Sequence, residues 1–314
     1  MLRFAVVGTG IMGANHARIG SQIRDIELTH VVDPTFERAE ALAAEYGGSP
    51  HRSVSEIASQ IDLAVVATPT STHFEVASEL IAAGVHVLVE KPIASTVEEG
   101  RALAGAAAAA GTVLMVGHVE RFNPAVLELD NLIDKPLHVA ATRVSAYSPR
   151  VEVGVILDLM IHDIDIVLNI LGPDIEDIYC VTSSARSGTE DLASVLLRFR
   201  SGATATLTAS RLGQQKIREL SVTQESNHIT VDLLRQDVTI NRVAHAEYLS
   251  SQGARYRQTG VVEIPFLEHR GEPLALELSE FVSAVNEGRP PRVDGEQGLR
   301  ALRVAHDILK AASV

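Results

Sequence analysis

The sequence predicts an α/β fold in two domains, a doubly wound parallel sheet at the N-terminus and then an α+β domain with a largely antiparallel sheet. Three observations support this prediction. The chain has 314 residues, which suits two domains better than one. Its first 120 or so residues alternate apolar, β-branched runs with helical patterns. After Gly117, several strand-like runs follow one another without intervening helices, which is typical of an antiparallel sheet.

The N-terminal part contains strand-like segments separated by helical segments. Short, nearly continuous apolar runs are typical of parallel strands that are buried on both faces. Thr35 can cap one helix, and Ser95 with Glu98 forms a capping-box pattern before another. The expected strands are residues 3–8, 28–32, 51–53, 62–67, 85–90 and 113–117, and the expected helices are 10–21, 35–46, 55–60, 72–83 and 95–110.

The C-terminal part has a different pattern, and we place the domain boundary near Val119. The predicted domains are therefore residues 1–119 and 120–314. The expected strands are 137–147, 177–184, 193–199, 203–210, 218–223, 227–232 and 236–241, and the expected helices are 124–133, 155–171, 274–286 and 296–312. Residues 242–271 carry no clear pattern, and 255–260 is expected to be a loop.

Composition excludes several classes of partner. The formal net charge of −13 disfavours binding to nucleic acid or to an anionic membrane surface. No apolar run approaches the roughly 20 residues of a membrane span, and the N-terminus has no secretory pattern. The single cysteine, Cys180, cannot form an internal disulfide, which fits a reducing compartment. These observations predict a cytoplasmic protein.

A glycine pattern follows the first expected strand. Gly8, Gly10 and Gly13 form Gly-x-Gly-x-x-Gly at the start of a helix, with Ile11 and Met12 between the last two. In this context the glycines allow a tight turn, the close approach of a pyrophosphate, and close packing of helix on strand. The free N–H groups of the helix then face the phosphates. The pattern predicts a dinucleotide-binding domain of the Rossmann type.

Asp33 follows the second expected strand, 20 residues after Gly13. A carboxylate at this spacing accepts hydrogen bonds from the adenosine ribose hydroxyls and repels a 2′-phosphate, so the sequence favours NAD over NADP. Arg38, one helical turn away, weakens this preference slightly. The alternative is that Asp33 only begins a turn.

Glu90-Lys91-Pro92 ends the fifth expected strand. Ligands bind at this edge of an open parallel sheet, where a lysine can stabilise a developing alkoxide. The alternative interpretation of Lys91 is a lysine on a solvated loop.

Asp158, His162 and Asp165 share one face of an expected helix. A histidine beside a carboxylate suits proton transfer near neutral pH. Two alternatives remain open from the spacing alone: a capped helix with a structural histidine, and a metal site.

Taken together, these motifs resemble the glucose–fructose oxidoreductase / inositol dehydrogenase (Gfo/Idh/MocA) family over essentially the whole chain. The motifs that carry the resemblance are Gly8 to Gly13, Ala67-Thr68-Pro69 with His73, Glu90-Lys91-Pro92, Gly117 to Pro124, and Asp158 through His162 to Asp165. The resemblance implies a dehydrogenase that acts on CH–OH groups, with a second domain whose open sheet face forms a homodimer or homotetramer. It also implies that no metal is used.

The resemblance assigns roles to individual residues. Lys91 matches the lysine beside the nicotinamide, His162 the acid–base group, and Asp158 the assisting carboxylate. Thr68, Pro69, His73 and Glu90 match cofactor-lining positions, and His118 falls where many members have asparagine near the nicotinamide.

Within the family, residues 117–124 and 158–163 are most similar to sugar-nucleotide members of the UDP-N-acetylglucosamine 3-dehydrogenase type. The C3 hydroxyl of such a sugar is then the expected site of oxidation. Because this substrate carries a diphosphate, Arg143 and Arg150 on either side of Tyr147 are expected to supply positive charge. Arg121 and Asp165 are further candidate substrate-binding residues. Two other functions remain open: an inositol or free-sugar dehydrogenase, and a non-catalytic NAD-binding sensor.

Overall fold

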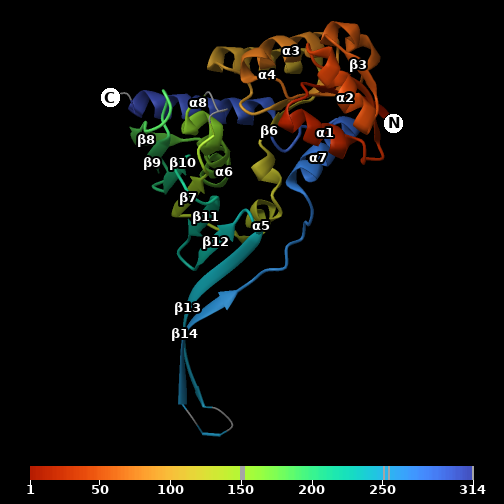
Figure 1. The fold of residues 1–314 in the computed structure, drawn as a ribbon. Helices are drawn as coiled ribbons and strands as arrows, with labels where there is room; N and C mark the ends of the chain where they lie inside the picture. Colours follow the sequence, from red (N-terminus) through yellow and green to blue (C-terminus); the bar gives the residue numbers. More distant parts are fainter. Residues whose placement is uncertain (149–152, 250–251, 254, 313–314) are drawn as a thin grey trace. The chain divides into compact units, whose positions relative to one another are not determined.

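The computed structural model describes residues 1–148, 153–249, 252–253 and 255–312 (Figure 1). The chain divides into two compact units. The first comprises Met1–Phe122 with Gly271–Arg303, and the second comprises Asn123–Arg270 with Val304–Val314. The predicted boundary at 119/120 thus lies close to the first division, but residues 271–303 fall in the first unit and not in the predicted second domain.

The first unit contains a parallel sheet with the strand order β3-β2-β1-β4-β5-β6 in the part of the chain that the structure describes. Its strands are β1 (Leu2–Val7), β2 (Ile26–Val32), β3 (Ser49–His51), β4 (Leu63–Val66), β5 (His86–Glu90) and β6 (Leu114–Gly117). Its helices before the boundary are α1 (Ile11–Gly20), α2 (Phe36–Tyr46), α3 (Thr70–Ala82) and α4 (Val97–Ala110), with short 3₁₀ turns η1 (Val54–Glu56), η2 (Ala58–Gln60) and η3 (Val119–Phe122).

The central strands of this sheet are buried on both faces, as their apolar runs predict. Every residue of β4 and β6 is buried, and so are Phe4 to Val7 of β1. Helix α4 begins at Val97 and not at residue 95, because its capping box pairs Thr96 with Glu99 and not Ser95 with Glu98. The sequence has two adjacent hydroxyl residues that could cap this helix, Ser95 and Thr96, and in the structure Thr96 is the N-cap.

Residues 271–303 join the first unit through helix α7 (Pro273–Glu287) and the first part of α8 (Gly295–Ala312). Arg18 of α1 forms an ion pair of 2.6 Å with Glu272 at the start of α7. A Cβ placed on Gly100 of α4 would lie 3.1 Å from Leu299, so α8 packs closely on this helix. From sequence order we expected residues 271–303 to belong to the second domain. They belong to the first unit because α7 and the first part of α8 bury their apolar faces there.

The second unit contains an eight-stranded sheet within the described residues, in the order β14-β13-β12-β11-β7-β10-β9-β8. Neighbouring strands are antiparallel except for the parallel pair β7 and β10. The strands are β7 (His138–Val144), β8 (Ile175–Ser183), β9 (Leu192–Phe199), β10 (Thr204–Ser210), β11 (Ile217–Thr223), β12 (His228–Asp232), β13 (Asp237–Leu249) and β14 (Arg255–Glu263). The predicted α/β class with these two sheet types is confirmed.

Helical segments of the second unit lie before β7 and between β7 and β8. They include α5 (Pro124–Leu132), a five-residue π-helical turn η4 (Ile156–Met160) and α6 (Ile161–Leu171). Strand β13 extends well beyond the predicted 236–241, and the expected loop at 255–260 lies in β14. Figure 1 shows these two strands as a long paired ribbon.

Among the described residues, no helix combines the length and the apolar character needed to cross a membrane.

Candidate functional site

A pocket of about 810 Å³ lies in the first unit at the carboxyl edge of the parallel sheet. It is lined by the segments that follow β1, β2, β4 and β5, which carry Gly8 to Met12, Asp33, Thr68 with Pro69, and Lys91. Ligands of open α/β sheets bind at this edge, and the volume falls within the range of cofactor sites. The pocket therefore brings together candidate residues from four separate segments of the first unit.

The glycine pattern forms the turn between β1 and α1. Gly8 has φ +94°, and a Cβ on it would lie 2.5 Å from the carbonyl oxygen of Ala67. A Cβ on Gly13 would lie 1.8 Å from the carbonyl oxygen of Gly8, so helix and strand approach too closely for any side chain there. Gly10 has nothing within 4 Å of such a Cβ, and no side chain caps α1. The helix N-terminus is thus open toward the pocket, as dinucleotide binding requires.

The Asp33 carboxylate accepts hydrogen bonds from both sides. Oδ2 accepts from the backbone N–H of Thr9 (3.1 Å) and from its hydroxyl (2.6 Å), and Oδ1 accepts from the N–H of Thr35 (2.9 Å). Asp33 therefore does begin a turn, as the alternative interpretation holds, and it also lines the pocket. A carboxylate has about four acceptor positions, so it can still accept from a ribose hydroxyl.

Two arginines line the pocket near Asp33. Arg38 on α2 is exposed, and Arg52 donates to the carbonyl of Pro34 (3.2 Å) while its guanidinium lies 5.0 Å from the centre of the Phe36 ring. The sequence analysis missed Arg52, because only the pairing of β2 with β3 brings residues near 51 beside Asp33. Arg38 and Arg52 place positive charge near Asp33, which bears on the choice between NAD and NADP, since NADP carries an additional 2′-phosphate.

His73 of α3 connects two loops of the pocket. Its Nδ1 lies 2.9 Å from the carbonyl oxygen of Pro92, and its Nε2 lies 2.9 Å from that of Thr68. Burial lowers the pKa of His73, although both carbonyls oppose this shift. A neutral imidazole carries one N–H, so in that state it can donate to only one of the two carbonyls. Its position holds the loop after β4 against the loop after β5.

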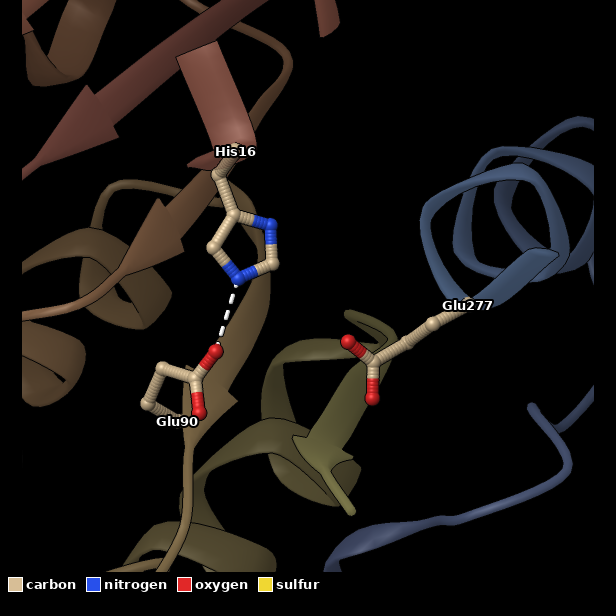
Figure 2. A group of neighbouring side chains, drawn as sticks. All are labelled: His16, Glu90 and Glu277. Carbon is tan, nitrogen blue, oxygen red and sulfur yellow. Dashed lines mark hydrogen bonds and ion pairs between the residues drawn. The ribbon is translucent and has the colours of Figure 1, made fainter. Parts of the chain in front are cut away.

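Glu90 and Lys91 stand at the end of β5 and line the pocket. The Glu90 carboxylate lies 2.7 Å from Nε2 of His16 on α1 (Figure 2). A Cβ on Gly117 of the neighbouring strand would lie 3.2 Å from this carboxylate, so glycine there leaves room for it. His118 and Arg121, by contrast, are buried, and neither belongs to the residues found to line this pocket within the described chain.

In the second unit, Asp158 and His162 lie on differently wound segments. Asp158 belongs to the π-helical turn η4 and His162 to the first turn of α6, whereas the sequence predicted one continuous α-helix over 155–171. A π-helical turn changes the angular phase between residues, so the four-residue spacing no longer sets their shared face. Both side chains are partly exposed, and Asp165 is buried. Turns of this kind are frequent at functional sites.

Arg143 is not available to a substrate diphosphate. It is 1% exposed, and its guanidinium binds the buried Asp163 carboxylate through Nε (2.9 and 3.0 Å) and one terminal nitrogen (2.7 Å). Strand β7 turns Arg143 toward α6, which alternation along a strand permits but sequence alone does not reveal. Arg150, the other expected source of charge, lies outside the described residues.

Two other arginines of the second unit lie beside candidate residues, and sequence reasoning missed both. Arg211 follows β10 and is buried, with a terminal nitrogen 3.9 Å from the Asp158 carboxylate and Nε 3.9 Å from Asp191. Arg186 is exposed, and its guanidinium carbon lies 5.6 Å from the centre of the Tyr147 ring. Both lie far in sequence from the residues that they accompany, so no local pattern could identify them.

Comparisons with known proteins agree with this geometry. Residues 2–118 match the GFO_IDH_MocA family, described as an oxidoreductase family with an NAD-binding Rossmann fold, and residues 126–229 match the GFO/IDH/MocA C-terminal domain. The chain is 32% identical over 306 residues to UDP-N-acetylglucosamine 3-dehydrogenase of Acidithiobacillus ferrooxidans, which covers 97% of this chain and 95% of that protein. The chain belongs to the Gfo/Idh/MocA oxidoreductase family. The resemblance stated from the motifs is thereby confirmed.

Other members of the family show the same likeness along the whole chain. A solved structure of the Acidithiobacillus ferrooxidans enzyme has a TM-score of 0.90 at 32% identity and covers 99% of this chain and 97% of that one. Myo-inositol 2-dehydrogenase of Thermotoga maritima is 27% identical over 335 residues, covering 99% of this chain and 96% of that protein. The family members that are similar to this chain therefore include dehydrogenases of both sugar nucleotides and inositol.

Proposed function

We propose that this protein transfers a hydride from a secondary alcohol of a sugar nucleotide to NAD, with the C3 hydroxyl of UDP-N-acetylglucosamine as the preferred site. The observation that carries this proposal is the 32% identity with UDP-N-acetylglucosamine 3-dehydrogenase over nearly the whole chain. A dehydrogenase of inositol or free sugars is the second candidate, supported by the full-length similarity to myo-inositol 2-dehydrogenase.

The pocket residues fit a dinucleotide. The open N-terminus of α1 would hold the pyrophosphate, with Gly10 leaving room for its approach. Asp33 would accept from the adenosine ribose, which favours NAD over NADP. Thr68 and Pro69 would line the cofactor, and when it is bound its nicotinamide accepts the hydride.

Lys91 and His162 carry the chemistry in this proposal. Lys91 lines the cofactor pocket and would donate a hydrogen bond to the substrate oxygen as negative charge develops on it. An imidazole nitrogen of His162 would accept the hydroxyl proton while the C–H bond delivers its hydride. Asp158 would orient His162, and the Arg211 guanidinium 3.9 Å away would position Asp158.

Charge for a diphosphate would come from Arg186 in place of Arg143. Arg186 is exposed beside Tyr147, whereas the guanidinium of Arg143 is buried against Asp163. A guanidinium can bind phosphate oxygens through two parallel hydrogen bonds, so one free arginine suffices to favour a nucleotide over inositol. Arg186→Ala should therefore raise KM for a UDP-sugar and leave KM for an uncharged polyol unchanged.

We further propose that the open face of the second unit's sheet joins copies of the chain. Tyr179, Val181 and Leu196 are exposed on neighbouring strands, 62%, 71% and 41% respectively, on the face opposite the buried residues of β9. Apolar side chains gathered in this way are typical of an interface between subunits. Light scattering after gel filtration should show a dimer or tetramer, and Val181→Lys should reduce its mass.

Substitution of the two proposed catalytic residues tests the reaction. Lys91→Ala and His162→Ala should each lower kcat by about 10²–10⁴-fold, the usual contribution of a positioned proton-transfer or charge-stabilising group. NAD binding, measured by calorimetry, should change little in His162→Ala. Activity close to that of the wild type in either variant would contradict the assigned role.

A further inference from the structure

Three buried titratable side chains of the first unit form a cluster at the pocket. They are His16 of α1, Glu90 at the end of β5, and Glu277 of α7. His16 and Glu277 are fully buried, and Glu90 is 7% exposed. One nitrogen or oxygen atom from each lies within 4.8 Å of the others, and Figure 2 shows the Glu277 carboxylate directed toward the His16–Glu90 pair.

Within this cluster, His16 and Glu90 are hydrogen-bonded to each other, whereas the Glu277 carboxyl group has no hydrogen bond among the described residues. Nε2 of His16 lies 2.7 Å from Oε1 of Glu90, and since an ionised carboxylate only accepts, Nε2 carries the hydrogen. Neither carboxyl oxygen of Glu277 has a hydrogen-bond partner among the described residues. An ionised carboxylate in that position would lack both water and donors, and it would face a second carboxylate.

Among the described residues, no cation lies within hydrogen-bond distance of the Glu277 carboxyl group. The elements that pack on α7 carry His16 and Arg18 on α1, and Glu120 and Arg121 on η3. Arg18 is bound to Glu272, and Glu280 of α7 itself is bound to Arg289. Burial, and secondarily the charge of Glu90, raise the pKa of Glu277 well above its ordinary value.

A bound metal ion is the competing explanation, and two features argue against it. A histidine that binds a metal almost always donates its other ring N–H to an acceptor, yet Nδ1 of His16 is buried without a partner among the described residues. The 2.7 Å separation of Nε2 from Oε1 is that of a hydrogen bond, and an imidazole N–H that donates to a carboxylate explains it without an ion.

We propose that Glu277 is a neutral carboxylic acid that holds the exchangeable proton of this cluster and so leaves the negative charge on Glu90, beside Lys91. Its consequence for catalysis rests on the proposed function: a carboxylate at the cofactor pocket favours the cationic, oxidised nicotinamide over the neutral, reduced form. Glu277 is then a positioning residue that acts through Glu90.

The pH dependence of stability tests this proposal without cofactor or substrate. Above about pH 5 a glutamate of the unfolded chain is ionised, while folded Glu277 keeps its proton, so stability falls as pH rises. The unfolding equilibrium constant of the wild type should rise about tenfold per pH unit relative to that of Glu277→Gln, until folded Glu277 ionises. Glu40→Gln, the same change at an exposed residue of α2, should show no such difference. Parallel pH profiles for wild type and Glu277→Gln would overturn the proposal.

Infrared spectroscopy provides a second readout that remains available if Glu277→Gln fails to fold. The apo wild-type protein at neutral pH should show the C=O stretch of a protonated carboxylic acid, which is lost on unfolding. Absence of this band would overturn the proposal. Elemental analysis of the purified full chain should find no stoichiometric metal; a metal that is lost in Glu277→Gln would instead establish the competing site. None of these measurements depends on turnover, so failure here is distinct from failure of the proposed function.

Discussion

The candidate residues of the two units are arranged by different means. In the first unit they follow the carboxyl ends of adjacent parallel strands, so the backbone alone brings Gly10, Asp33 and Lys91 to one pocket. In the second unit, side chains of one short region have different partners: Arg143 is buried on Asp163, whereas Asp158 stays partly exposed near Arg211. Sites built by strand topology can therefore be predicted from local sequence, whereas sites built by side-chain pairing cannot.

The buried ion pair of the second unit gives the largest expected effect on stability. Arg143→Ala should destabilise the protein by about 3–5 kcal/mol, because the buried Asp163 carboxylate would lose its counterion. Urea denaturation measures this loss. The double variant Arg143→Met with Asp163→Leu should recover most of it, since it leaves no unpaired charge. If Arg143→Ala were as stable as the wild type and only raised KM for the substrate, the original expectation that Arg143 binds substrate would be supported instead.

In the first unit, two neighbouring glycines should respond differently to the same change. Gly13→Ala should cost about 3 kcal/mol of stability, because its Cβ would meet the Gly8 carbonyl at 1.8 Å and the turn must move. Gly10→Ala should fold normally, since nothing lies within 4 Å, and should weaken NAD binding by blocking the approach to the helix N-terminus. Denaturation and calorimetry separate the two effects. Equal loss of stability in both variants would contradict the packing described here.

Asp191 holds the loop that carries Arg186, and its contribution to the stability of the fold should depend on pH. Backbone N–H groups of residues 185–187 and the Ser187 hydroxyl hold the pKa of Asp191 well below its ordinary value. A carboxyl with a lowered folded pKa stabilises the fold above the pKa of the unfolded chain, and this stabilisation is lost as pH falls. Asp191→Asn should therefore be less stable than the wild type at pH 7, with the difference shrinking below about pH 4. Asp237→Asn, at an exposed position, should show no such trend.

The smallest expected effect concerns cofactor choice. Asp33→Asn removes the negative charge from the pocket while keeping a side chain that can bond to Thr35. The ratio of NADP to NAD affinity should rise about tenfold, equivalent to about 1.4 kcal/mol, because Arg38 and Arg52 then face a 2′-phosphate without an opposing carboxylate. Competition binding gives this ratio, with Glu37→Gln as the control. An unchanged ratio would remove Asp33 as the determinant of preference.

Local pattern predicted most of the fold but not its long-range pairings. Buried apolar runs predicted the parallel strands, and alternation predicted β9 and β10 closely. Residues 255–260 carry Arg, Gln, Thr and Gly and were expected to form a loop, yet they belong to β14, which pairs with β13. Strand β14 obtains its backbone hydrogen bonds from β13, so it can form without an alternating apolar pattern of its own.

Within the candidate site, sequence predicted the residue types but not their partners. Gly13, Asp33 and Lys91 could be selected because their spacing from a strand end is fixed. Arg52, Arg186 and Arg211 could not, since each reaches the candidate residues only through the tertiary fold. Glu277 lies 187 residues after Glu90 and comes beside it only because α7 returns to the first unit.

The central claim is the oxidation of a sugar nucleotide, and one assay tests it most directly. Purified protein is mixed with NAD and, separately, UDP-N-acetylglucosamine, other sugar nucleotides, myo-inositol or free hexoses, and the absorbance of reduced cofactor is followed. Our account predicts turnover with UDP-N-acetylglucosamine, and a kcat that Lys91→Ala and His162→Ala each lower by about 10²–10⁴-fold. Turnover with inositol or free hexoses alone would contradict the proposed substrate, and silence across the panel despite NAD binding would contradict the proposed reaction.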